Sequence, residues 1–290
     1  MQAIELSGRD YNNIRKNKKQ IGSGVDGSAY VINKDTIYKF YHKLNNNITL
    51  PNATLDSEGV IINDFKSLRP YNKVIQNENI YYTDNEGVIL TREEAIYKAI
   101  EKQRNIKLTD LPKNIIYVSN KIVGCEYKYY PHRFGIYASV YLPLNIRLKI
   151  CKRIIEKVKE LLDNNIYPVT LAQRDSMYPF KSNGSNILIG LDLEPLIIDL
   201  DGISAMYSDS YSSKYYNKVL STLSSLVLEL LLKVKLADNI EDDDYVVNEY
   251  CSLMEEAGIT NILSKKFFDN NYLELDEIEN VIKSLELRKK

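Results

Sequence analysis

The stretch IGSGVDGSAYVINKDTIYKFYHK, residues 21–43, places three glycines within six residues, followed by two short apolar runs and a lysine between aromatic residues. Gly22, Gly24 and Gly27 have the spacing G-x-G-x-x-G. A glycine-rich turn lets the backbone approach a polyphosphate closely, and Lys39 on the following strand would reach the same phosphates. The glycines also fit an ordinary hairpin turn, so a phosphate site requires further residues from elsewhere in the chain.

The 290-residue chain is long enough for one large domain or two lobes, and 44% hydrophobic residues indicate a globular protein. A net charge of −1 favours neither nucleic acid nor a membrane surface as partner. The cysteines Cys125, Cys151 and Cys251 form neither a disulfide framework nor a metal motif, so we expect a reducing, cytoplasmic setting. Two histidines are too few for a histidine-rich metal site, and they argue against a histidine-based catalytic triad.

The first 130 residues predict a mostly β region with one helix. Short apolar runs bounded by glycine, asparagine or lysine predict strands within 17–43 and at 73–75, 80–83, 88–90, 115–119 and 122–129. Thr91 precedes Glu94 by three residues, as in a capping box, and the apolar positions that follow predict a helix over 92–105. Pro131 ends this region.

Beyond Pro131 the pattern becomes helical. Apolar residues at helical spacing run from Leu148 to Leu162. Two β-like runs at 187–189 and 196–200 interrupt the helical pattern. Further helices are predicted at about 215–236, 245–257 and 274–287.

The stretch SNGSNILIGLDLEPLIIDLDG, residues 182–202, supplies the second half of the expected site. A strand–turn–strand hairpin would bring Asn186 and Asp199 to the same end. There an amide oxygen and a carboxylate could share magnesium, which prefers oxygen ligands. Taken singly, Asn186 also fits a turn cap, and Asp199 and Asp201 fit carboxylates on a solvated loop.

These elements, in this order, resemble the protein-kinase-like superfamily. The family has a glycine-rich loop, a strand lysine paired with a helix glutamate, a catalytic aspartate and asparagine, and a metal-binding aspartate near glycine. The resemblance covers about residues 17–236 and implies an α+β, two-lobed protein-kinase-like fold. A β-rich N-terminal lobe would span 1–130, with an insert at about 44–90, and a helical C-terminal lobe would span 131–290.

The resemblance also implies ATP and Mg²⁺ as cofactors and assigns the site residues. Glu93 from the helix would pair with Lys39, with Glu94 as the alternative, and Tyr127 would close the back of the adenine pocket. Metal ligands would be Asn186 and Asp199. The remaining nucleotide contacts implied are those of Gly22, Ser23, Gly24, Gly27, Lys39, Lys128 and Tyr130.

The chain departs from the family at the catalytic base. Thr170 stands where the family has an aspartate, and about ten extra residues follow, with Asp175 inside them. Asp175 could fold back as a displaced base, or its loop could be unrelated to catalysis. The sequence therefore favours a phosphotransferase acting on protein Ser/Thr hydroxyls, with an unknown protein or small molecule as acceptor. A nucleotide-binding pseudokinase, a small-molecule kinase and a non-catalytic interaction protein remain the alternatives.

Overall fold

The computed structural model describes residues 3–23, 27–42, 72–76, 79–83, 87–89, 92–171, 186–201, 205–233, 252, 254, 255 and 272–287. The chain divides into two compact units. The first consists of Met1–Pro131, Asp163–Ile166 and Asp199–Ser212, and the second of His132–Leu162, Tyr167–Ile198 and Ser213–Lys290. The segments 163–166 and 199–212, which the sequence analysis assigned to the C-terminal region, thus belong to the first unit.

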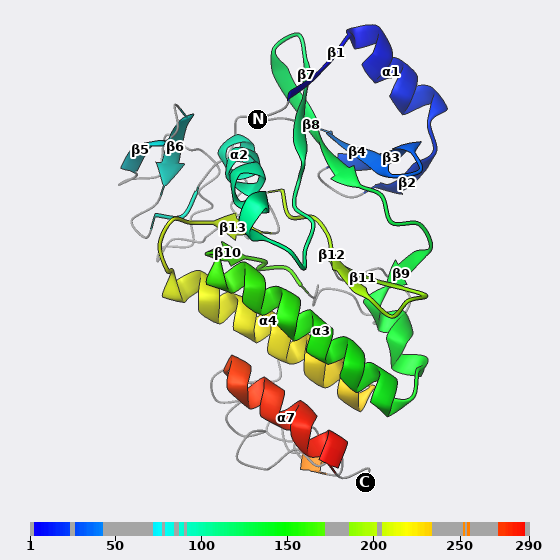
Figure 1. Ribbon diagram of the computed structural model, residues 1–290, viewed down its shortest axis with the longest axis vertical. Coiled ribbons are helices and arrows are strands. Elements are labelled where there is room, and N and C mark those ends of the chain that lie inside the picture. Colours follow the sequence, from blue (N-terminus) through cyan, green and yellow to red (C-terminus); the bar gives the residue numbers. More distant parts are fainter. Residues whose placement is uncertain are drawn as a thin grey trace, which may run out of the picture. The chain divides into compact units, whose positions relative to one another are not determined.

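A six-stranded sheet forms the framework of the first unit, in the order β1-β7-β8-β4-β3-β2 (Figure 1). β1 runs parallel to β7, and the other neighbours are antiparallel. The strands predicted within 17–43 and near 115–129 are confirmed, whereas β1 was not predicted. The bounds are β1 Ala3–Leu6, β2 Gln20–Ser23, β3 Gly27–Asn33, β4 Thr36–Tyr41, β7 Asn114–Val118 and β8 Lys121–Lys128.

Two helices cover opposite faces of this sheet. Successive residues of a strand point to opposite faces, so Ile115 and Ile116 of β7 belong to different cores. Ile115 packs with Ile96, and Ile116 lies in a cluster bordered by Tyr11 and Ile14. The helix predicted over 92–105 is confirmed as α2 followed by a 3₁₀ turn, while the N-terminal helix was not predicted. The bounds are α1 Gly8–Asn17, α2 Arg92–Lys102 and η2 Gln103–Asn105.

Shorter β elements complete the first unit. The predicted hairpin is confirmed as β5, Asn72–Gln76, antiparallel to β6, Asn79–Thr83. The strand predicted at 88–90 is reduced to an isolated bridge between Val88 and Ser208. Two-residue strands lie at β13, Met206–Tyr207, and at β10, Ile166–Tyr167, of which Tyr167 belongs to the second unit.

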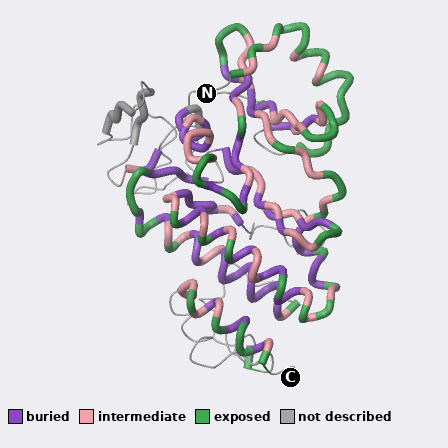
Figure 2. Tube along the Cα trace, in the orientation of Figure 1, coloured by how far each residue is buried: buried purple, intermediate pink, exposed green. Residues whose placement is uncertain are grey.

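The second unit is helical with one small sheet. Its three strands have the order β12-β11-β9, and both pairings are antiparallel. Figure 2 shows runs of buried residues along α3 and α4, whereas α1 in the first unit has none. The helix predicted at 245–257 lies almost entirely outside the described residues. The bounds are β9 Arg133–Gly135, η3 Ile136–Tyr141, α3 Leu144–Asp163, β11 Ile187–Gly190, β12 Pro195–Ile197, α4 Ser213–Leu232 and α7 Leu275–Leu287.

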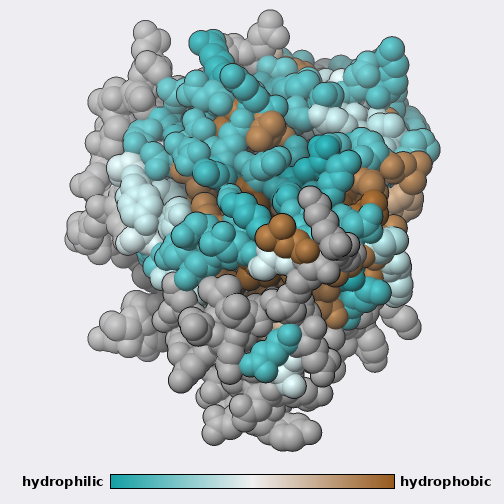
Figure 3. Space-filling model, turned by 60° about the horizontal axis from the view of Figure 1, so that its bottom comes forward, coloured by the Kyte–Doolittle hydropathy of each residue, from teal (hydrophilic) through white to brown (hydrophobic). Residues whose placement is uncertain are grey.

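The α+β fold class predicted from the sequence is confirmed. A β-sheet N-terminal region precedes a helical C-terminal part. Every helix within the described ranges is too short or too polar to span a lipid bilayer. On the face shown in Figure 3, hydrophobic residues form separate groups among hydrophilic ones.

Candidate functional site

Lys39 lies on β4, a strand paired on both sides within the sheet. Its sheet partners are Ala29 on β3 and Cys125 on β8. Because side chains two residues apart share a face, Lys39 and Tyr41 point to the same side of the sheet, the side that α2 covers. The side chain of Lys39 is 14% exposed, so its ammonium group lies largely out of water.

Two carboxylates of one short segment surround this ammonium group. Lys39 donates to Asp199 Oδ1, and its Nζ lies 2.7 Å from Asp201 Oδ2. The two aspartates differ in burial, since Asp199 is 25% exposed and Asp201 is fully buried. All three residues belong to the first unit, so the structure brings together Lys39 and Asp199, two residues predicted from the sequence.

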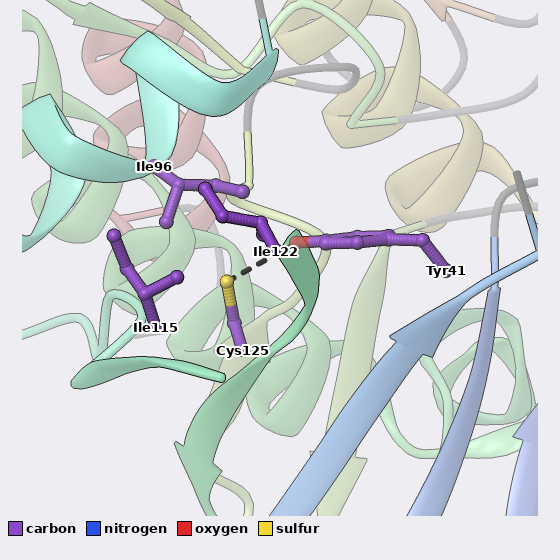
Figure 4. Packing of buried hydrophobic residues seen from close by; sticks show 5 residues of the cluster. All are labelled: Tyr41, Ile96, Ile115, Ile122 and Cys125. Carbon is purple, nitrogen blue, oxygen red and sulfur yellow. Dashed lines mark hydrogen bonds between the residues drawn. The ribbon is translucent and has the colours of Figure 1, made fainter. Parts of the chain in front are cut away.

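Asp201 is enclosed by polar side chains from the sheet. The hydroxyl of Tyr41 donates to Asp201 Oδ2 at 3.0 Å and lies 3.2 Å from Cys125 Sγ (Figure 4). The other carboxylate oxygen, Oδ1, is buried and has no hydrogen-bond partner among the described residues. The hydroxyl of Tyr127 is also buried without a partner in this part of the structure. A buried oxygen without a hydrogen-bond partner can bind a cation or accept a hydrogen bond from a water molecule.

Burial and charge set the ionisation of these groups. Burial alone lowers the pKa of the Lys39 ammonium, but the charges of Asp201 and Asp199 outweigh it and raise that pKa above its usual value. Burial, followed by the charge of Asp201, raises the pKa of Tyr41, Tyr127 and Tyr207 well above the usual range. Lys39 therefore stays charged and the three tyrosines stay neutral at physiological pH.

Asp199 adopts an unusual backbone conformation. Its φ angle is +66°, in the left-handed region that non-glycine residues rarely occupy. The sequence pattern predicted a strand over 196–200, but β12 ends at Ile197, because the chain turns at Asp199. Such conformations persist where the surrounding structure holds them, and they are frequent at functional sites.

The glycine-rich hairpin joins β2 to β3. Gly22 and Ser23 lie at the end of β2, and Gly27 begins β3, while Gly24 lies outside the described residues. A side chain at Gly27 would collide with the backbone of Phe40, whereas one at Gly22 would have no neighbour within 4 Å. Packing thus explains Gly27 and leaves room beside Gly22.

The hydroxyl groups of this hairpin meet a histidine. Ser23 Oγ lies 3.0 Å from Ser28 Oγ, and the Nε2 atom of His42 lies 3.4 Å from Ser28 Oγ. Ser23 and His42 are exposed, whereas Ser28 is buried. These groups add hydrogen-bonding capacity to the hairpin beside Gly22.

The segment expected to hold adenine follows β8. The backbone N–H of Tyr129 donates to the carbonyl of Asp35 at 3.0 Å. The hydroxyl of Tyr130 donates to Asp110, and the ammonium of Lys128 lies 4.7 Å from the centre of the Tyr130 ring. The side chains of Lys128 and Tyr130 thus fix this segment, and adenine contacts by its backbone stay a prediction.

The described part of helix α2 leaves open the prediction that Glu93 or Glu94 pairs with Lys39. Glu93 lies in the first turn of α2, and its side chain is outside the described residues; Glu94 is buried. Farther along α2, the buried Lys98 lies 2.7 Å from Asp209 and 3.1 Å from Glu101.

Asn186 lies in the second unit, next to β11. Its side-chain amide donates to the hydroxyl of Thr170 at 2.8 Å, and its backbone N–H donates to Leu171 at 3.2 Å. Its carbonyl accepts from Ile198 N–H at 2.8 Å, which confirms the predicted strand–turn–strand hairpin. Thr170, at the expected position of the catalytic aspartate, therefore contacts the predicted metal ligand. Asp175 lies outside the described residues, and the pairing of Asn186 with Asp199 at one metal ion stays a prediction.

Sequence reasoning gave too little weight to Asp201 and missed Tyr41 and Gly124. The alternative interpretation of Asp201 as a carboxylate on a solvated loop is wrong, because the residue is fully buried. The spacing Asp-Leu-Asp was visible in the sequence, but nothing in it distinguishes the partly exposed aspartate from the fully buried one. At Gly124, a side chain would collide with the backbone carbonyl of Lys39.

The residues present fit magnesium bound together with phosphates. Among the described residues no group of three or more His, Cys, Asp or Glu side chains could hold a metal. Magnesium, however, is usually held by one or two carboxylates plus the phosphates of a substrate. Asp199, which is partly exposed, supplies such a carboxylate, and the buried Oδ1 atom of Asp201, which has no hydrogen-bond partner among the described residues, lies on the same short segment.

No protein-family model and no curated protein matches this chain. Among solved structures, that of an apo pseudokinase is similar to it, with a TM-score of 0.49 and 10% sequence identity. The similarity covers 98% of this chain and 97% of that chain. The assignment of site residues therefore depends on the contacts of this chain alone.

Proposed function

We propose that the protein is an ATP- and magnesium-dependent phosphotransferase of kinase-like fold that acts on protein serine or threonine hydroxyls. The observation that carries the proposal is the buried cluster in which Lys39 meets Asp199 and Asp201. A buried ammonium group beside two carboxylates, on a sheet that begins with a glycine-rich hairpin, offers complementary groups to a triphosphate and its cation.

Each group has a separate task in this proposal. Lys39 would bind phosphate oxygens, and the hairpin at Gly22 would lie over the phosphates. Asp199 would be a magnesium ligand. Asn186 would be a second one, because its position in the sequence matches that of the metal-binding asparagine in the kinase-like motif. ATP supplies the phosphoryl group and magnesium stabilises its charge, so the protein's contribution is chiefly positioning and electrostatics.

A thermal-shift titration with ATP, with and without MgCl₂, tests nucleotide binding. We expect ATP to raise the melting temperature and magnesium to increase the shift. Asp199→Ala should remove the magnesium-dependent part, and Lys39→Ala should lower nucleotide affinity. If both variants bind ATP as the wild type does, the site assignment is wrong. No shift with any nucleotide would indicate the non-catalytic interaction protein.

Transfer of the terminal phosphoryl group to a panel of proteins tests catalysis. In the active enzyme a base must come within hydrogen-bond reach of the acceptor hydroxyl, and Asp175 is the proposed base. Asp175→Asn should then reduce transfer sharply while ATP affinity stays nearly unchanged. An unchanged rate would remove Asp175 from the mechanism, and transfer to small hydroxyl compounds alone would indicate a small-molecule kinase.

The hydrogen bond between Asn186 and Thr170 favours a second candidate, a nucleotide-binding pseudokinase. A threonine hydroxyl is a far weaker base than a carboxylate, and it occupies the position expected for the catalytic aspartate. Nucleotide binding without transfer to any acceptor would support this candidate. A cytoplasmic location is part of both proposals, supported by three cysteines that are far apart in the sequence and form no disulfide framework.

A further inference from the structure

The two carboxylates that meet Lys39 are not equivalent. Asp201 is fully buried, and its Oδ2 atom accepts from both Lys39, at 2.7 Å, and the hydroxyl of Tyr41, at 3.0 Å. Asp199 is partly exposed and lies at a left-handed turn. Water can therefore replace a partner of Asp199, whereas a buried charge at Asp201 depends on the groups around it.

The surroundings of Lys39 fix both ends of its side chain. Its backbone lies in a strand paired on both sides, and Gly124 of β8 approaches its carbonyl so closely that a side chain there would collide. Its ammonium group is held by Asp201, which Tyr41 in turn orients from the same face of the sheet. In Figure 4 the Tyr41 hydroxyl points into the cluster, toward Cys125.

We propose that Asp201 is a positioning residue that holds the ammonium group of Lys39 ready for phosphate, while Asp199 serves as the cation ligand. This inference rests on the proposed nucleotide site. It gives Asp201 the role that the kinase resemblance assigned to a helix glutamate. Placement of Lys39 would then depend on the segment that carries the metal-binding aspartate, and both groups would be set by one stretch of chain.

The substitution Asp201→Asn tests the proposal because it keeps the size of the side chain and removes its charge. Without that charge the ammonium group of Lys39 is held less firmly, and the loss should affect phosphate contacts alone. We expect the Kd for Mg²⁺-ATP and Mg²⁺-ADP to rise about tenfold, which corresponds to about 1.4 kcal/mol. The Kd for adenosine, which has no phosphate, should stay unchanged.

Two further variants separate positioning from general damage. Asp192→Asn removes an aspartate of the second unit that pairs with Arg133 at 3.0 Å, and it should leave all three affinities unchanged. In a Lys39→Met background, Asp201→Asn should cause no further loss of ATP affinity, because the group that it positions is gone.

Weaker binding of both adenosine and ATP by Asp201→Asn would overturn the proposal. Additive effects of Lys39→Met and Asp201→Asn on the free energy of ATP binding would likewise overturn it. Unchanged ATP affinity in Asp201→Asn would also overturn it. If the wild type binds none of the three ligands, the proposed function fails. The pairing is then decided by thermal unfolding of the wild type, Asp201→Asn, Lys39→Met and the double variant, in which additive changes in melting temperature would refute the Lys39–Asp201 dependence.

Discussion

Gly22 and Gly27 belong to one glycine-rich hairpin, yet substitution by alanine should affect a different property of the protein at each position. A Cβ atom at Gly27 would lie 2.5 Å from the carbonyl oxygen of Phe40 and 3.3 Å from Cα of Tyr41. A Cβ atom at Gly22 would have no neighbour within 4 Å. Gly27→Ala should therefore reduce stability, and Gly22→Ala should reduce only ligand binding.

The magnitude at Gly27 follows from what would have to move. The colliding atom belongs to the backbone of β4, which is paired on both sides and carries Lys39, so it cannot shift cheaply. Overpacking of this kind costs about 1–3 kcal/mol. For a protein of this size that corresponds to a fall in melting temperature of about 2–6 °C. Gly22→Ala removes backbone freedom without strain and should change stability by less than about 1 kcal/mol.

The two variants are compared by thermal unfolding without ligand and by titration with Mg²⁺-ATP. Gly22→Ala should melt close to the wild type and bind ATP more weakly, since a methyl group would fill the space beside the phosphates. Gly27→Ala should have a lower melting temperature than the wild type. If Gly22→Ala destabilises the protein as much as Gly27→Ala and leaves ATP binding unchanged, the hairpin is an ordinary turn and the reasoning is refuted.

Three further predictions concern single residues. Thr170→Asp places a carboxylate beside Asn186 and should increase phosphoryl transfer measured with radiolabelled ATP; a fall would show that the position is not that of the base. Arg147→Met should lower the free energy of unfolding in urea by about 2–4 kcal/mol, because buried Arg147 donates to the carbonyls of Leu142, Leu230 and Leu231. Burial raises the pKa of Cys151 to about 12, so wild type should lose stability relative to Cys151→Ala as pH rises from about 8.5 to that value, and a pH-independent difference would contradict this.

Local patterns predicted most of the described elements. The capping box before α2 and the alternation in β7 and β8 depend on neighbours in sequence, and those elements were found close to their predicted bounds. Helix α1 was missed because its apolar face consists of only Tyr11 and Ile14, and none of its residues is fully buried. A signal was present, since the hydroxyl of Ser7 accepts from the N–H of Asp10 at 3.1 Å, as in an N-cap.

The pairing of strands that are far apart in the chain could not be predicted from the sequence. β1 joins β7 in parallel across more than a hundred residues, and no local pattern encodes such a partner. The isolated bridge between Val88 and Ser208 has the same cause. The two segments 163–166 and 199–212 join the first unit through contacts of this kind, such as the bond from Lys102 Nζ to the carbonyl of Asn164 at 2.7 Å and the bridge to Val88.

Composition and spacing did not predict that the two aspartates of the candidate site differ in burial. In a continuous strand, Asp199 and Asp201 would point to the same face and have similar surroundings. The left-handed turn at Asp199 ends the strand, so one carboxylate is partly exposed and the other fully buried although only Leu200 separates them. Both carboxylates nevertheless contact Lys39. The division of tasks that we propose for the two aspartates thus originates in a single backbone conformation, which a pattern of residue types does not encode.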